Sequence, residues 1–351
     1  MPTGSKDPDV LLAWLLDSMG LVRRKSEGMS IDDEQGALHR LMRETLLSEP
    51  LKGWDTKSLG DASGLSQTGM HHQLVKLRES GLVAAETEGR WHIHVLRGGS
   101  ISAAVDLVSV QARAILDLRL SEVAERVTES DDRMVIPSED GRGGFQIEIA
   151  EPGATVEGED RLDALMRDLG LNGERGKHND RLARQLFEEI SSSGRATTLL
   201  ALADKTGDSR SRVQRAVERM RAAGIAERVP MLDRIAQDVY AGLMRQHDAR
   251  GEEWLMTRGG LGRLDESVSK SLIAGVKKKS LNIEKVQDIL APVPLDAQRV
   301  LLNTLGGRMP YGIRISGRDG AAVKERVMRQ ADRTLRRLRT VAQRLDESLA
   351  S

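Results

Sequence analysis

Residues 65–83 combine hydrogen-bonding side chains with an apolar stripe at helical spacing. Met70, Leu74 and Leu77 recur four and three residues apart, so on a helix they form one core-facing stripe. The opposite face presents amide, hydroxyl, imidazole and ammonium groups, which are suited to reading base edges in a major groove. An arginine at the turn beyond the helix is suited to phosphate. The predicted DNA contacts of this segment are Gln67, Thr68, His71, His72, Gln73, Lys76 and Arg90.

A second helix, expected over 209–223, is rich in arginine. Its buried stripe is Val213, Val217 and Met220, and Glu218 is the acidic residue set against five arginines. Arginine contacts phosphate and reads guanine through a bidentate pair. The same face also fits a solvated surface used for protein contacts, but the excess of arginine favours DNA. The predicted contacts are Arg210, Arg212, Arg215 and Arg219.

The two helices occupy the same place in an arrangement that occurs twice, which indicates an approximate internal repeat. Each copy has three helices, a glycine that ends the third helix, and a strand, which is the plan of a winged helix-turn-helix. In the second copy, 254–260 is expected to supply the returning wing strand after an inserted helix over 231–246. The first copy comprises helices from 37, 59 and 66, Gly81, and strands 82–87 and 91–96; the second comprises helices from 181, 199 and 209, Gly224, and strand 225–229.

The first copy resembles the ArsR-like winged-helix repressors over residues 36–97. It shares a Leu-Ser-Gln start, a histidine pair displaced by one position, a Leu-Arg-Glu-small-Gly-Leu-Val end and a Glu-Gly-Arg-Trp wing. The resemblance implies a dimeric DNA-binding regulator of transcription. The chain departs from the family in two ways: it has no cysteine for the thiolate metal box, and Val75-Lys76 reverses the usual basic-then-apolar order. The shared motifs are Leu65–Gln67, His71-His72, Leu77–Val83 and Glu88–Trp91.

Composition excludes several classes of protein. With 53 basic and 53 acidic side chains among 351 residues, the formal net charge is zero, so the chain is no histone-like polycation. Its eight aromatic residues are too few for the stacking platforms of single-strand binders, which favours duplex DNA as the partner. The absence of cysteine excludes disulfides and thiolate metal sites. No apolar run is long enough to cross a bilayer, and we expect a cytoplasmic protein.

Neither a catalytic motif nor a cofactor motif is found. The glycine clusters at 141–144 and 259–262 match neither a phosphate-binding loop nor a dinucleotide fingerprint. Five of the seven histidines fall between His39 and His94. His92 and His94 share one face of a strand, which allows a metal site because imidazoles two residues apart on a strand point the same way. No carboxylate completes a ligand set, so we expect no metal, no cofactor and no enzyme activity, and we keep a histidine-based metal-responsive repressor as a weaker alternative.

The main alternative is a protein–protein scaffold built from tandem winged helices. It is favoured by the neutral net charge and by residues 131–176, which hold twelve acidic and five basic side chains. Such a segment repels DNA. The preferred prediction remains a sequence-specific regulator that binds duplex DNA stoichiometrically, as a homodimer. The seam between the two subunits is assigned either to helix 101–128 or to the C-terminal helix 319–349. The apolar positions of that C-terminal helix fit a coiled coil or packing on its own domain equally well.

The predicted fold class is mostly α with small β-hairpins, made of two winged helix-turn-helix domains and a C-terminal helical region. Short strands are also expected at 134–136 and 145–149. The predicted segments are an N-terminal amphipathic helix (1–30), the ArsR-like domain (31–99), a long helix and candidate dimerisation element (100–130), an acidic linker or small subdomain (131–176), the second winged-helix domain (177–265) and a helical C-terminal region with a candidate coiled coil (266–351).

Overall fold

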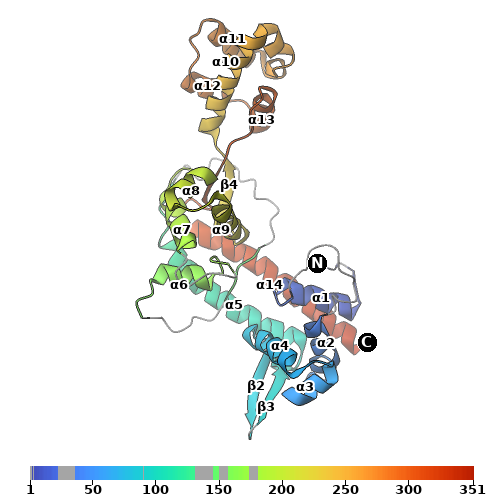
Figure 1. Ribbon diagram of the computed structural model, residues 1–351. Coiled ribbons are helices and arrows are strands. Elements are labelled where there is room, and N and C mark those ends of the chain that lie inside the picture. Colours follow the sequence, from blue (N-terminus) through green and yellow to red (C-terminus); the bar gives the residue numbers. More distant parts are fainter. Residues whose placement is uncertain are drawn as a thin grey trace. The chain divides into compact units, whose positions relative to one another are not determined.

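The computed structural model describes residues 2, 4–22, 36–89, 91–130, 145–149, 157–173 and 181–351 (Figure 1). Over these residues the protein is mostly helical with small antiparallel sheets, as predicted. The chain forms two compact units, each built from segments far apart in the sequence. Unit 1 comprises 1–121, 149–154 and 327–351, and unit 2 comprises 122–148 and 155–326.

Unit 1 places a three-stranded antiparallel sheet, in the order β1-β3-β2, beside its helices. The register of the sheet pairs Trp54 with His94 and Val83 with Leu96. The elements of this unit are α1 (Pro8–Ser18), α2 (Ala37–Leu41), the π-helical turn η2 (Met42–Leu46), β1 (Trp54–Asp55), α3 (Thr56–Ser63), α4 (Gln67–Glu79), β2 (Val83–Glu88), β3 (Trp91–Leu96), the 3-10 turn η3 (Arg97–Gly99), most of α5 (Ile101–Ala124) and the larger part of α14 (Gly320–Ala350).

The C-terminal helix packs on its own chain. Leu338, Val341 and Leu345 of α14 are at most 6% exposed and belong to the same core as α1, α2 and α4. The apolar stripe of α14 is therefore used inside unit 1. Of the two interpretations of its pattern, the structure favours the amphipathic helix over a free coiled-coil seam.

Helices α5 and α14 run antiparallel in unit 1. The carboxylate of Asp346 accepts hydrogen bonds from the backbone N–H groups of Ile101 (3.3 Å) and Ser102 (2.9 Å) at the start of α5. Two ion pairs follow in antiparallel order, between Arg339 and Asp106 (2.5 Å) and between Arg113 and Asp332 (2.9 Å). These contacts fix the register of the two helices.

Unit 2 contains a second small sheet and two groups of helices. Its elements are α6 (Arg161–Asp168), α7 (Leu182–Ser192), α8 (Leu199–Thr206), α9 (Arg210–Ala222), β4 (Ala226–Pro230), α10 (Leu232–Thr257), the 3-10 turn η5 (Leu261–Arg263), α11 (Glu266–Lys277), α12 (Ile283–Leu290), α13 (Leu295–Thr304) and β5 (Tyr311–Ile315). Strands β4 and β5 are antiparallel, and Thr197 forms a bridge to Ile313 on the other side of β5. The order Thr197-β5-β4 therefore reproduces the order β1-β3-β2.

The internal repeat has a constant spacing. Helices α3 and α4 start at residues 56 and 67, and α8 and α9 start at 199 and 210, so matching positions lie 143 residues apart. The glycines that follow α3 and α8, Gly64 and Gly207, both take the left-handed conformation (φ 66° and 69°), and so do Gly81 and Gly224 after the third helix of each copy. The two copies therefore share one local fold up to the strand that follows the third helix.

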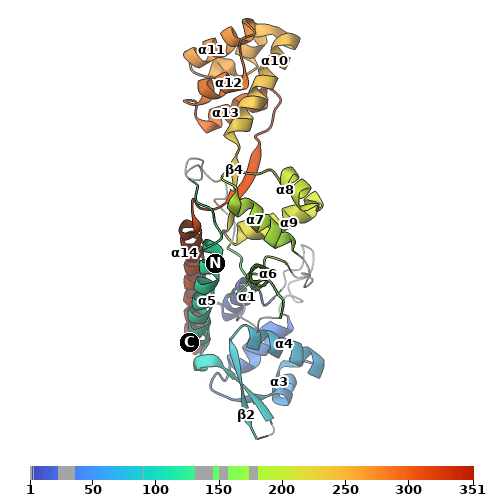
Figure 2. The ribbon, with the colours of Figure 1, turned by 90° about the vertical axis from the view of Figure 1, so that its left-hand side faces the viewer.

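The copies diverge at the tip of the sheet. In the first copy β2 ends at Glu88 and β3 already begins at Trp91, whereas in the second copy residues 231–310 separate β4 from β5. This insert contains α10 to α13, which gather beyond the end of β4 (Figures 1 and 2) and bury their own apolar core, including Leu243, Leu272 and Leu302. Hairpin tips are common sites of tolerated insertions because little backbone there is buried.

Three predictions of local structure were wrong. Residues 254–257 belong to helix α10 instead of a wing strand, and Leu255 is fully buried in the core of the insert; a short apolar run fits either structure. The strand that pairs with β4 is Tyr311–Ile315, inside the range predicted to be helical. Residues 145–149 form no strand, although the N–H of Gln146 donates to the carbonyl of Ala222 (3.0 Å). The strand expected at 134–136 lies outside the described residues.

Candidate nucleic-acid interface

Local hydrogen bonds fix the position of α4. Asp55 caps α3 by accepting from the N–H groups of Lys57 (2.9 Å) and Ser58 (3.0 Å). Gly64 then turns the chain, and the hydroxyl of Ser66 accepts from the N–H of Gly69 (3.2 Å) to cap α4. Met70, Leu74 and Leu77 are at most 4% exposed, so the predicted stripe faces the core. The polar face of α4 is thereby turned outward.

Most of the side chains predicted on this helix are accessible. Gln73 differs, because it is only partly exposed and its amide oxygen is buried without a hydrogen-bond partner among the described residues. That oxygen is not available to a base unless the side chain rotates. Arg90 lies outside the described residues. The exposed members of the predicted set are Gln67, Thr68, His71, His72 and Lys76.

The arginines predicted on α9 fall into two groups. Arg210, Arg212 and Arg215 are exposed, and Arg212 forms an ion pair with Asp208 of the preceding turn. Arg219 is partly buried, and its Nε donates to the carbonyl of Leu171 (2.7 Å) at the end of α6. The structure therefore separates Arg219 from the other three, because the turn after α6 lies against this side of α9.

The repeat identifies two further polar side chains that sequence reasoning missed. Ser211 and Gln214 are exposed on α9 at the positions that match Thr68 and His71 on α4. The signal in the sequence is the constant spacing of 143 between the helix starts, at 67 and 210. With these two, each third helix presents small hydrogen-bonding groups near its N-terminus.

The described part of the acidic segment is bound to the second copy. Arg184 of α7 forms ion pairs with Asp160 and Asp163 of α6 (3.1 Å each). The N–H of Leu162 bonds to Asp160 and, together with Arg184, lowers the pKa of that carboxyl below its ordinary value. Part of the negative charge that would repel DNA is therefore matched by arginines of the same unit.

The paired strand histidines have different environments. His92 is exposed, whereas His94 is 4% exposed and its Nε2 lies 3.3 Å from the hydroxyl oxygen of Thr56. Burial lowers the pKa of His94 below its ordinary value, and the cation of Arg78 acts in the same direction, so the ring is neutral at pH 7. The described residues contain no group of three or more His, Cys, Asp or Glu side chains arranged to hold a metal ion. The geometry adds no support for the metal-responsive alternative.

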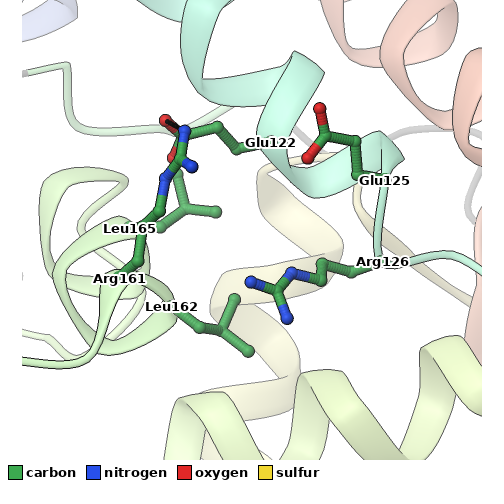
Figure 3. A pocket seen from close by; sticks show the side chains of 6 residues that line it. All are labelled: Glu122, Glu125, Arg126, Arg161, Leu162 and Leu165. Atoms are coloured by element: carbon green, nitrogen blue, oxygen red, sulfur yellow. Dashed lines mark hydrogen bonds and ion pairs between the residues drawn. The ribbon is translucent and has the colours of Figure 1, made fainter.

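Figure 3 shows a small hollow in unit 2 between the end of α5 and α6. It encloses about 230 Å³, counting space open to solvent, and an ion pair between Arg161 and Glu122 (2.7 Å) lies across its wall. Its lining contains no serine, threonine, lysine or histidine, and the carboxylate of Glu122 is already engaged by Arg161. Its lining residues are Glu122, Glu125, Arg126, Arg161, Leu162 and Leu165.

No helix in the described part of the chain has an apolar stretch that would cross a membrane. Comparison with known protein families, with curated proteins and with solved structures finds no match to this chain.

Proposed function

We propose that the protein is a cytoplasmic transcriptional regulator that binds duplex DNA stoichiometrically through two winged-helix domains. The recognition helices are α4 and α9. One observation supports this most: the exposed polar row of α4 opposes a fully packed apolar row, and the same helix recurs as α9 in the same local fold. Polar groups near the N-terminus of such a helix read base edges, and flanking cations hold phosphates.

The two domains contribute differently. The first has hydroxyl, amide and imidazole groups for base contact and little net charge, so its affinity alone is low. The second has Arg210, Arg212 and Arg215 for phosphate, but its wing is replaced by the insert 231–310. Linking the two in one chain multiplies their modest affinities through effective concentration.

Base reading by α4 has a specific test. Replacing Thr68 and His72 together by alanine is expected to change the sequences selected from random duplex DNA, while affinity for non-specific duplex falls less than about threefold, because phosphate contacts supply most non-specific binding. The matched control is Thr257→Ala with His247→Ala, the same residue types on α10. Equal losses on all sequences, or an unchanged preference, would remove α4 from base readout.

The homodimer is the second part of the proposal, and we place its seam on α5. Leu107, Val110 and Leu118 are 44%, 65% and 51% exposed and share one face of the helix, while the apolar stripe of α14 is already buried. Rows of exposed apolar side chains mark protein contacts, and a two-fold axis would place this row against its own copy.

Val110→Glu is therefore expected to shift the protein to monomer, raising the dimer dissociation constant by about tenfold or more because a charge would be buried in the seam. Sedimentation equilibrium measures this shift. Leu200→Glu is the control, since Leu200 is 60% exposed in unit 2 and distant from α5 in sequence. If both variants associate like the parent protein, α5 is not the seam.

One observation favours the scaffold alternative. Leu200, in the first turn of α8, stands where the first copy has Lys57, so an apolar side chain replaces a cation at the edge of the proposed interface. Random duplex at low salt discriminates between the two functions. A regulator with exposed arginines binds such a duplex at micromolar concentration, and a scaffold does not.

A further inference from the structure

Four arginines lie on the outer side of α14 within unit 1: Arg333, Arg336, Arg337 and Arg344. On an α-helix these positions fall within about 100° of one another around the axis. The first three side chains are exposed and Arg344 is partly exposed. None of the four guanidinium groups has a hydrogen bond or ion pair with a residue in the described part of the chain. We call these four residues the arginine ridge.

The acidic residues of the same stretch face elsewhere. Asp332 binds Arg113, and Asp346 accepts the first N–H groups of α5, so both carboxylates are used where α14 meets α5. Arg339, which lies outside the ridge, pairs with Asp106 at the same place. Glu347 is exposed one turn beyond Arg344 and marks the end of the ridge. The acidic side chains Asp332 and Asp346 therefore lie on the face of α14 that meets α5, whereas the arginine ridge lies on the solvent-facing side.

The chemistry of the ridge fits phosphate. Arginine stays charged at all relevant pH values, and its planar fork matches phosphate oxygens. From Arg333 to Arg344 the helix rises about 16 Å, a length over which duplex DNA carries about ten phosphates. Thr340 lies among the arginines, and no apolar side chain interrupts them to form the desolvated centre that a protein partner needs.

We infer that the arginine ridge is a second, sequence-independent surface for duplex DNA. The inference rests on the proposed function, since it assumes that duplex DNA is the partner. In both views of the ribbon α4 and α14 lie on opposite sides of unit 1 (Figures 1 and 2), and the ridge faces away from the core that separates them. The ridge therefore contacts a stretch of duplex other than the one bound by α4.

The test uses the full chain with all four ridge arginines replaced by glutamine (R333Q, R336Q, R337Q and R344Q). Fluorescence anisotropy with random duplex is measured across a series of salt concentrations. We expect affinity at 50 mM salt to fall by at least about tenfold and the slope of log K against log salt to become shallower by about 2 to 4. Thermal melting followed by circular dichroism checks that the variant is folded.

The control removes four lysines of the insert, with the same change in net charge (K277Q, K278Q, K279Q and K285Q). An equal loss in the control would mean that only net charge matters and would overturn the inference. So would an unchanged slope in the ridge variant. Loss of binding to poly-L-glutamate with duplex binding intact would assign the ridge to an acidic protein instead.

The Thr68 and His72 variant separates this inference from the proposed function. If that variant keeps the parent sequence preference while the ridge variant loses its salt slope, recognition by α4 is wrong and the ridge still binds DNA. If the preference changes and the ridge variant behaves like the parent, the ridge is wrong and recognition by α4 remains.

Discussion

Replacing Glu227 by alanine is expected to lower the free energy of unfolding by about 3–5 kcal/mol. Glu227 on β4 is 3% exposed and accepts a hydrogen bond from Arg314 Nε on β5 (2.7 Å). Its other oxygen accepts from Arg326 Nη1 on α14 (2.5 Å). Removing the carboxylate takes the acidic partner away from a buried guanidinium, which is among the most destabilising single changes in a protein.

Urea denaturation of the full chain measures this change. Glu86→Ala is the control, because Glu86 is an exposed residue of the corresponding strand of the first copy and should change stability by less than about 0.5 kcal/mol. Arg326→Ala should cost less than Glu227→Ala, since the Arg326 side chain is 33% exposed. A loss below about 1 kcal/mol for Glu227→Ala would show that the pair does not hold β4 to β5.

Replacing Arg210 and Arg215 together by alanine is expected to weaken binding to random duplex by about tenfold or more and to make the salt slope shallower by about 2. Both side chains are exposed at the N-terminal half of α9, where phosphate contacts position a recognition helix. Anisotropy titrations at several salt concentrations give both quantities.

Arg219→Ala is the matched comparison on the same helix. Because its Nε donates to the carbonyl of Leu171, we expect this variant to lose about 1–3 kcal/mol of stability while its salt slope stays unchanged. If Arg219→Ala flattens the salt slope as much as the double variant does, the division of the α9 arginines into binding and structural residues is wrong.

The sequence was sufficient to predict the third helix of each copy because both have strong local signals. Apolar residues at helical spacing, a serine at the start and a glycine at the end all depend on neighbours within a few turns. The exposed rows of α4 and α9 follow directly from that periodicity, so the positions of Thr68, His72 and Arg215 were predictable.

The return strand was not predictable from local pattern. Its partner β4 ends at Pro230 and β5 begins at Tyr311, and only long-range pairing identifies the two as neighbours. The role of Arg219 was hidden for the same reason, because Leu171 approaches it from another part of the chain. The interactions of the buried Glu227 carboxylate could not be predicted from neighbouring residues either, since both of its arginine partners lie beyond residue 310.

The two copies share one local fold but differ at the end of the sheet, where the second copy carries the insert 231–310 between β4 and β5. Five paired positions of β4 and β5, from Ala226 with Ile315 to Pro230 with Tyr311, keep the base of the second sheet intact while the insert adds its own core. The buried pair of Glu227 and Arg314 joins these two strands directly. The second copy thus keeps a third helix that matches α4, while the insert 231–310 stands between its two strands.

Site-directed cross-linking tests whether α4 enters the major groove of duplex DNA, because the chain has no cysteine and one introduced thiol is unique. Thr68→Cys places that thiol on the exposed face of α4, and Ser271→Cys places it on an exposed position of α11 as a control. With duplex DNA carrying thiol-modified bases in the major groove, we expect rapid disulfide cross-linking at position 68, suppressed by unmodified duplex, and little at position 271. Equal, slow cross-linking at both positions would contradict major-groove binding by α4.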